Sequence, residues 1–414
     1  MGDYTQRMRQ GIQTGLVLMG GGARAAYQVG VLQAIADIYE QAGGPGGNPF
    51  PIVAGTSAGA INGAALACGA DDFVGAVRML AGVWTNLHAE DIYRADSLGV
   101  MRTGARWLSM LSIGWVIARW RRARPKSLLD NQPLAELLSH LLDTRRIDYM
   151  MRQGHLRALA VTASSYSSGH HVTFYQSREN ILPWTRSQRQ AVRARIAREH
   201  LLASAAIPFV FPAVPLKLSG EVEYFGDGSM RQAAPISPAV HLGAERILIV
   251  GAGRMQEPPG RRLVSQEYPT LAQIAGHALS NIFLDAMAVD VERLQRINNT
   301  LSLMSPEVRE KTKLRPIDLL VIAPSQRLDD IAGKHVGALP VPVRAMLRAL
   351  GVTSDPNDAR GAALASYLLF EPDYTRELMA LGRDDTMARR DEVCRFFGWG
   401  TEETAGAALS VAAA

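Results

Sequence analysis

The stretch from residue 51 to residue 69, PIVAGTSAGAINGAALACG, can fold in few ways. Its short apolar start is typical of a buried strand, and its Ala-rich end has the length and composition of a helix. Because only GTSAG separates the two, the chain must pass from strand to helix in one tight turn, which Gly55 and Gly59 permit. We therefore expect Ser57 on a nucleophile elbow, at the N-terminus of a helix. The alternative is an ordinary strand-to-helix turn.

Apolar runs of strand length recur along the chain, with helical patterns between them. These runs occupy residues 15–19, 156–163, 245–251 and 317–323. Strands that alternate with helices form a mostly parallel sheet, because each helix returns the chain to the start of the next strand. Residues 213–225 are typical of a smaller hairpin beside that sheet. We predict an α/β fold, a three-layer α/β/α sandwich with a mostly parallel central sheet and additional C-terminal helices.

The strand patterns stop at about residue 326, and only helical patterns follow. From this change we expect four parts. They are an N-terminal arm over 1–12, an α/β domain over 13–325 with a helical insertion at about 84–150, a helical C-terminal extension over 326–400, and a flexible tail over 401–414.

Composition excludes several classes of protein. Two cysteines, Cys68 and Cys394, give no disulfide framework, and no Cys/His cluster suggests a metal site. The chain shows no signal-peptide pattern and no apolar run of the roughly 18 residues that a spanning helix needs. The formal net charge of +5 suits an anionic surface, but no nucleic-acid-binding motif accompanies the Arg-rich stretches at 119–126 and 186–198. We expect a cytoplasmic protein, peripheral on a membrane, with no metal, no organic cofactor and no nucleic-acid partner.

A second glycine-rich turn, GGGARAA, follows the first apolar run. Gly20, Gly21 and Gly22 would point backbone N–H groups at an anion, at the start of a helix. A dinucleotide loop would need glycine at the position of Ala25, and a Walker loop would need Gly-Lys-Ser/Thr. The remaining interpretation is an oxyanion hole that serves a serine on a neighbouring strand. Arg24 either adds positive charge to this anion site or pairs at the surface.

Asp227 ends a strand-like run in EYFGDGSMRQAAP. From the sequence alone, Asp-Gly is first of all a turn signal. A triad in the order Ser, acid, His would need a histidine after Asp227, and three follow, namely His241, His277 and His335. None stands on a short loop directly after a strand, so we expect each of them to be structural.

Four blocks in this order and spacing resemble the patatin-like phospholipase family. They are GGGARA at 20–25, GTSAG at 55–59, ASAAIPFVFPAV at 203–214 and DGSMRQAAP at 227–235. The resemblance covers roughly residues 13–255 and implies a patatin-like hydrolase domain. Two positions depart from the family pattern, since Ala25 stands where glycine is usual and Ser229 where glycine or alanine is usual.

The resemblance implies a dyad without histidine, with Ser57 as the nucleophile and Asp227 as the base. It further implies hydrolysis of phospholipids or other acyl-ester lipids, of phospholipase A or lysophospholipase type, through an acyl-enzyme. A carboxylate is a weak base in water, with a pKa near ~4, so Asp227 needs burial or help from the glycine loop. Two alternatives stay open. One is a general carboxylesterase or thioesterase acting on soluble esters, and the other is a non-catalytic lipid-binding scaffold.

An apolar segment with a basic end is the candidate for membrane contact. Residues 107–118 have only two polar side chains, and their apolar side chains go nearly all round a helical wheel. The segment is too short to span a bilayer. Tryptophan favours the membrane interface and an arginine cluster attracts anionic head groups. The residues proposed for this contact are Trp107, Trp115, Trp120, Arg121, Arg122 and Arg124. The alternative is a buried helix with a solvated end.

Overall fold

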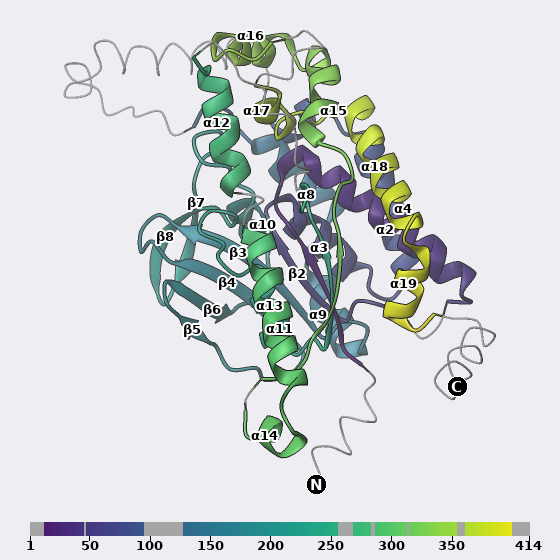
Figure 1. Ribbon diagram of the computed structural model, residues 1–414. Helices are drawn as coiled ribbons and strands as arrows, with labels where there is room; N and C mark the ends of the chain where they lie inside the picture. Colours follow the sequence, from purple (N-terminus) through teal and green to yellow (C-terminus); the bar gives the residue numbers. More distant parts are fainter. Residues whose placement is uncertain are drawn as a thin grey trace.

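The computed structural model describes residues 12–44, 47–94, 127–255, 268–282, 286–312, 314–353 and 361–399. Within these ranges one ten-stranded mixed sheet lies between layers of helices (Figure 1). The strands are β1 (Thr14–Leu18), β2 (Ile52–Thr56), β3 (Ala158–Ser165), β4 (His171–Ser177), β5 (Thr185–Arg186), β6 (Arg189–Arg193), β7 (Val214–Leu218), β8 (Glu221–Asp227), β9 (Arg246–Val250) and β10 (Asp318–Ile322).

Five neighbouring strands, in the order β10-β9-β1-β2-β3, are parallel. Beyond β3 the sheet continues through antiparallel β4 and then β6 and β5, while β8 pairs with the carboxyl end of β3 and with β7. The register places Thr56 opposite Thr162 on one side of β3 and Asp227 opposite Ala163 on the other. Backbone pairing therefore brings the residue after Thr56, which is Ser57, and Asp227 to the same end of β3.

Helices cover both faces of the sheet. They are α2 (Ala26–Gln41), α3 (Ala58–Cys68), α4 (Phe73–Thr85), α5 (Ala89–Ile92), α8 (Gln132–Leu141), α9 (Arg145–Gln153), α10 (Arg198–Ser204), α11 (Ser237–His241), α12 (Leu271–Ser280), α13 (Ala286–Ser302), α14 (Pro306–Glu310), α15 (Leu328–His335), α16 (Val341–Ala349), α17 (Ala362–Ser366), α18 (Pro372–Met387) and α19 (Arg390–Phe397), with 3₁₀ turns η1 (Gly22–Ala25) and η3 (Val336–Ala338). No helix in the described ranges is long and apolar enough to cross a lipid bilayer.

Alternate side chains of the central strands enter two separate cores. In β1, Leu16 and Leu18 join the core that contains α2, α3 and the C-terminal helices, whereas Val17 joins the core formed with α11 and α13. This alternation follows from the period of two in a strand, and it makes both faces of β1 fully buried. The predicted three-layer sandwich with a mostly parallel sheet and C-terminal helices is confirmed.

The strands predicted from apolar runs correspond to β1, β2, β3, β9 and β10, and the predicted hairpin corresponds to β7 and β8. Strands β4, β5 and β6, which continue the sheet beyond β3, were not predicted from the sequence. In β6 only the central residue is buried, so RQAVR has no apolar run that marks it as a strand. Of the proposed insertion at about 84–150, the structure describes α5, α8 and α9 but not residues 95–126.

Helix α18 lies along α2, although the two are far apart in the sequence (Figure 1). Two glycines allow this close approach. A Cβ on Gly30 would lie 1.9 Å from the carbonyl oxygen of Met379, and a Cβ on Gly382 would lie 2.2 Å from that of Tyr27. The two backbones therefore touch, and α18 packs against the α/β core without a layer of side chains at these points.

We expect Gly30→Ala to destabilise the protein by roughly 1 to 3 kcal/mol, because the added methyl group forces α2 and α18 apart. Gly82→Ala is the matched control, since Gly82 is an exposed residue within α4 with no atom near the position of a Cβ. That change should raise helix propensity and leave the thermal midpoint unchanged or slightly higher. Equal midpoints for the two variants would contradict the close packing of α2 on α18.

Candidate active site

Ser57 lies at the turn between β2 and α3. Its backbone has φ 55° and ψ −132°, a conformation that residues other than glycine rarely adopt. Two hydrogen bonds hold this strained turn. The Ser57 N–H donates to Ser204 Oγ at 2.8 Å, and Ser204 Oγ donates to the carbonyl oxygen of Thr162 at 2.6 Å. A residue of α10 therefore fixes the elbow to the neighbouring strand β3.

The glycines on either side of the elbow are required by close contacts. A Cβ on Gly55 would lie 2.5 Å from the carbonyl oxygen of Gly59, and a Cβ on Gly59 would lie 2.4 Å from that of Leu18. The second contact lets the start of α3 approach the end of β1, where the glycine-rich turn begins. It thereby brings Ser57 and the loop at 20–22 to the same place.

Asp227 forms the central contact of the site. Ser57 Oγ donates to Asp227 Oδ2 at 2.6 Å, and the backbone N–H of Ser229 donates to Oδ1 at 2.8 Å. Both Ser57 and Asp227 are buried, with exposed fractions of 1% and 0%. Burial raises the pKa of Asp227 from 3.8 to about 6, because the hydrogen bonds from Ser57 and Ser229 only partly offset the loss of water around the carboxylate.

The turn after Asp227 is anchored on three sides. The N–H of Asp227 donates to the carbonyl of Ala206 at 2.8 Å, and the N–H of Gly228 donates to that of Ser204 at 3.1 Å. His171 Nε2 lies 2.9 Å from the carbonyl oxygen of Gly228. Burial lowers the pKa of His171 to about 4, so its ring is neutral at physiological pH and donates this hydrogen bond. His171 thus supports the turn that carries Asp227.

The glycine-rich loop leaves β1 and enters the 3₁₀ turn η1, which runs directly into α2. Gly20, Gly21 and Gly22 are all buried, and Gly22 lines the same pocket as Ser57. Among the described residues, no acceptor binds the backbone N–H of Gly21 or of Gly22. Two free donors near the start of a helix suit a developing negative charge.

Arg24 does not take the role expected of it. Its side chain is buried, with 2% exposed, and forms an ion pair with Asp329 and a 2.8 Å hydrogen bond from Nε to Ser366 Oγ. The guanidinium also lies 4.1 Å from the centre of the Tyr367 ring. The expectation of an anion-binding or surface-paired arginine is therefore corrected. Side chains from the C-terminal part of the chain pair with Arg24 and cover it. Its charge is therefore not available to a substrate anion.

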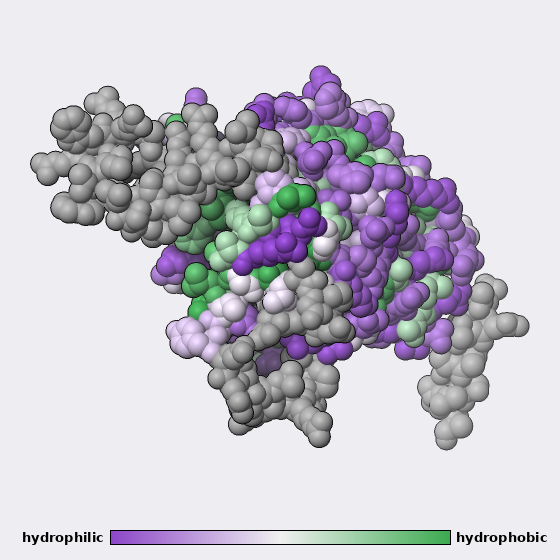
Figure 2. All heavy atoms as spheres, turned by 90° about the horizontal axis from the view of Figure 1, so that it is seen from above, coloured by the Kyte–Doolittle hydropathy of each residue, from purple (hydrophilic) through white to green (hydrophobic). Residues whose placement is uncertain are grey.

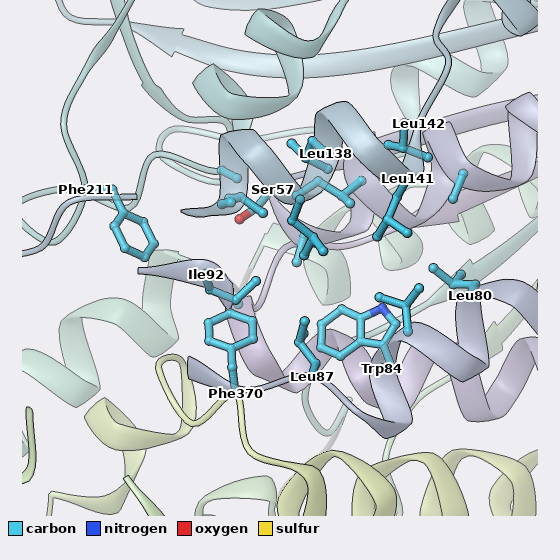
Figure 3. A pocket seen from close by; sticks show the side chains of 18 of the residues that line it. Ser57, Leu80, Trp84, Leu87, Ile92, Leu138, Leu141, Leu142, Phe211 and Phe370 are labelled. Carbon is cyan, nitrogen blue, oxygen red and sulfur yellow. The ribbon is translucent and has the colours of Figure 1, made fainter. Parts of the chain in front are cut away.

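An apolar pocket opens from Ser57 between α3, α4 and α8 (Figure 3). Its empty space, including the part open to solvent, is about 740 Å³. Apart from Ser57, every side chain that lines it is apolar. The lining residues are Gly22, Ser57, Ala58, Ile61, Ala65, Met79, Leu80, Val83, Trp84, Leu87, Ile92, Leu134, Leu137, Leu138, Leu141, Leu142, Ala205, Ile207, Phe211 and Phe370. Such a surface suits a hydrocarbon chain.

The three histidines that follow Asp227 in the sequence have other contacts. His241 stacks on Trp184 with 4.6 Å between ring centres, and His335 Nε2 lies 2.6 Å from a carboxylate oxygen of Glu377. His277 lies within α12. In the described part of the chain, none of them bonds to Ser57 or Asp227 or lines the pocket.

Sequence reasoning missed Ser204 and His171. The signal for Ser204 was a single polar residue in the apolar block at 203–214, whereas His171 carried none that separates it from its neighbour His170. The departure at Ser229 is harmless to the contact with Asp227, because Ser229 makes it through its backbone. The residues proposed for membrane contact, Trp107, Trp115, Trp120, Arg121, Arg122 and Arg124, lie outside the described residues.

Comparisons with known proteins give one family. A family model described as "Patatin-like phospholipase" matches residues 16–240, just over half of the 414 residues. Among solved structures, VipD from Legionella pneumophila is similar, with 13% sequence identity and a TM-score of 0.29 over 89% of this chain and 67% of that chain. No curated protein matches the sequence.

The buried carboxylate predicts an unusual stability effect. The pKa of Asp227 is raised on folding, so the folded state favours the protonated group and loses stability as pH rises from about 4 through about 6. At neutral pH the ionised carboxylate costs about 3 kcal/mol relative to a neutral group. Asp227→Asn should therefore stabilise the protein, and by about 1 kcal/mol more at about pH 7.5 than at about pH 5. Thermal melts at the two pH values measure this; a gain that shrinks as pH rises would contradict it.

Proposed function

We propose that this chain, which belongs to the patatin-like phospholipase family, is a lipid acyl hydrolase that uses Ser57 as its nucleophile and Asp227 as its general base. The observation that supports this most directly is the 2.6 Å hydrogen bond from Ser57 Oγ to Asp227 Oδ2 beside an otherwise apolar pocket that Ser57 lines. In the described residues, no histidine forms a hydrogen bond with the side chain of either group.

In the acylation step, Asp227 accepts the hydroxyl proton of Ser57 while Ser57 Oγ attacks the ester carbonyl carbon of the lipid. Above about pH 6 the carboxylate is ionised, and its raised pKa makes it a stronger base than an exposed aspartate. The negative charge that develops on the carbonyl oxygen is stabilised by the free N–H groups of Gly21 and Gly22 and by the first N–H groups of α3.

The tetrahedral intermediate then collapses. The bond between the carbonyl carbon and the alcohol oxygen breaks, and protonated Asp227 returns its proton to the leaving alcohol. Water attacks the resulting acyl-serine ester while Asp227 accepts a proton from it. The second intermediate releases the fatty acid, and the proton on Asp227 returns to Ser57 Oγ. One ester and one water thus give one alcohol and one carboxylic acid.

The apolar pocket favours a lipid over a small soluble ester. Its wall runs along α3, where Ala58, Ile61 and Ala65 share one face with helical spacing. The distance from Ser57 to Ala65 along the helix axis is about 12 Å, at roughly 1.5 Å for each residue. A pocket of this depth binds the acyl chain of a phospholipid or related ester, and we propose that the head group stays outside it.

We propose that the protein meets its substrate at a membrane surface. Seen from above, at the carboxyl ends of the parallel strands, apolar side chains gather on the exposed surface (Figure 2). Exposed apolar residues on the helices at this end include Leu271 and Ile274 on α12 and Val341 on α16. The segment at 105–129, with its tryptophans and arginines, stays a prediction for the same contact.

The dyad is tested by comparing variants of Ser57, of Asp227 and of three histidines. Their activity is measured on phospholipid vesicles and on a soluble short-chain ester. Ser57→Ala and Asp227→Asn should each reduce kcat by roughly a thousandfold or more, because groups that act as one unit fail together. His241→Ala, His277→Ala and His335→Ala, the controls, should keep their activity. A fluorophosphonate should label the wild type at Ser57, as peptide mass spectrometry would detect. A folded wild type that is not labelled would instead support a non-catalytic lipid-binding scaffold.

The acyl pocket is tested by a graded series at Ala65, on the pocket face of α3. Ala65→Val, Ala65→Leu and Ala65→Phe should progressively shorten the preferred acyl chain, since each fills more of the pocket about 12 Å from the nucleophile. We expect the ratio of kcat/KM for a long-chain ester to that for a butyrate ester to fall at least tenfold in Ala65→Phe. A uniform loss at every chain length would contradict this placement of the acyl chain.

A further inference from the structure

The C-terminal helices reach the glycine-rich loop from outside the part of the chain that the family model matches. The match ends at residue 240, whereas the partners of Arg24 are Asp329 on α15, Ser366 on α17 and Tyr367 directly after it. We propose that these partners hold the loop at 20–22 in the geometry that stabilises the oxyanion, so that Arg24 and Asp329 are positioning residues of the active site. This inference rests on the proposed function.

The side-chain contacts form a closed set around Arg24. Asp329 compensates its charge, Ser366 accepts from Nε at 2.8 Å, and the Tyr367 ring covers the guanidinium at 4.1 Å. Ser366 Oγ in turn donates to the carbonyl of Ala363 at 2.6 Å. The side chain of Arg24 is only 2% exposed, and an unpaired charge in such a place is strongly unfavourable, so its position depends on these groups being in place.

The same C-terminal segment also touches the loop backbone. The N–H of Ala23 donates to the carbonyl of Tyr367 at 3.1 Å. Gly22 lies so close to this carbonyl that a Cβ would be 2.3 Å from the oxygen, and its φ of 55° also requires glycine. Three residues after Tyr367, Phe370 lines the apolar pocket. One short stretch, residues 366–370, thus contacts the loop, Arg24 and the pocket.

The loop needs external partners because three successive glycines have the greatest backbone freedom. Its first end is fixed by the α/β core. The N–H of Met19 donates to the carbonyl oxygen of Val250 at 3.3 Å, and the carbonyl oxygen of Met19 accepts from Gln28 Nε2 at 2.6 Å. Its second end, at Ala23 and Arg24, is fixed by the C-terminal helices. Donors stabilise an oxyanion only when they are oriented before the reaction, so the second anchor should affect the transition state more than the bound substrate.

The test uses the full chain with four variants. Asp329→Asn removes the charge partner, Asp329→Glu restores it, and Ser366→Ala removes a single acceptor of Arg24. Tyr27→Phe is the matched control, since it removes a partly buried 2.9 Å hydrogen bond, from Tyr27 to Asp385, that joins α2 to α18 without involving Arg24. Amide hydrogen exchange of the peptide covering residues 19–25 measures loop order, and kcat and KM on a soluble short-chain ester measure its effect on catalysis.

We expect Asp329→Asn to speed exchange of that peptide about tenfold or more and to lower kcat about tenfold to a hundredfold, with KM within about twofold. Ser366→Ala should show the same pattern more weakly, Asp329→Glu should recover most of kcat, and Tyr27→Phe should change neither readout. If Asp329→Asn does not fold, Ser366→Ala decides the question.

Unchanged exchange at residues 19–25 would overturn the inference, whether or not the ester is hydrolysed. An equal rise in exchange and loss of kcat in Tyr27→Phe would also overturn it, because the effect would then be general loosening of the C-terminal helices. A different result would separate the two proposals. If the wild type hydrolyses no ester, but its loop is protected from exchange and loses that protection in Asp329→Asn, the proposed function is refuted and the anchor of the loop is supported.

Discussion

The structure of the site depends on one hydrogen bond between two buried groups, Ser57 and Asp227. A carboxylate without water around it is costly, and folding compensates only partly through donors from Ser57 and Ser229. In the proposed mechanism, the uncompensated remainder makes Asp227 a stronger base than an exposed aspartate. The apolar pocket that Ser57 lines offers few polar groups to the pair from that side, and Asp227 itself is fully covered by protein.

Strand β3 and Ser204 connect the parts of this pair. The parallel register with β2 fixes one partner, the antiparallel register with β8 fixes the other, and Ser204 bonds to both turns and to Thr162 on β3. Four segments that are distant in the sequence therefore share a single hydrogen-bonded junction. The strain at Ser57 persists because this junction determines its backbone from several sides.

Local patterns were enough to predict the five parallel strands, the elbow and its glycines, since buried strands and tight turns leave strong signals in composition. The strands β4, β5 and β6 were missed because polar residues interrupt each of them, so none contains an apolar run, although β4 is almost entirely buried. Asp227 became a candidate only through the family resemblance, as Asp-Gly by itself signals a turn. The contacts of Arg24, Ser204 and His171 could not be predicted, because each depends on residues far away in the sequence, in the case of Arg24 and Asp329 by 305 positions.

That separation has a consequence for the order in which the protein is made. Ribosomes add roughly 5 to 20 residues each second, so Arg24 is synthesised about 15 to 60 seconds before Asp329. During roughly the last third of this interval, after Asp227 has been added, the nucleophile, the base and the glycine loop are all in the growing chain, but the helices that enclose the arginine are not. On the proposed function and the proposed anchor of the loop, hydrolysis by the nascent chain would stay slow until translation has passed residue 370.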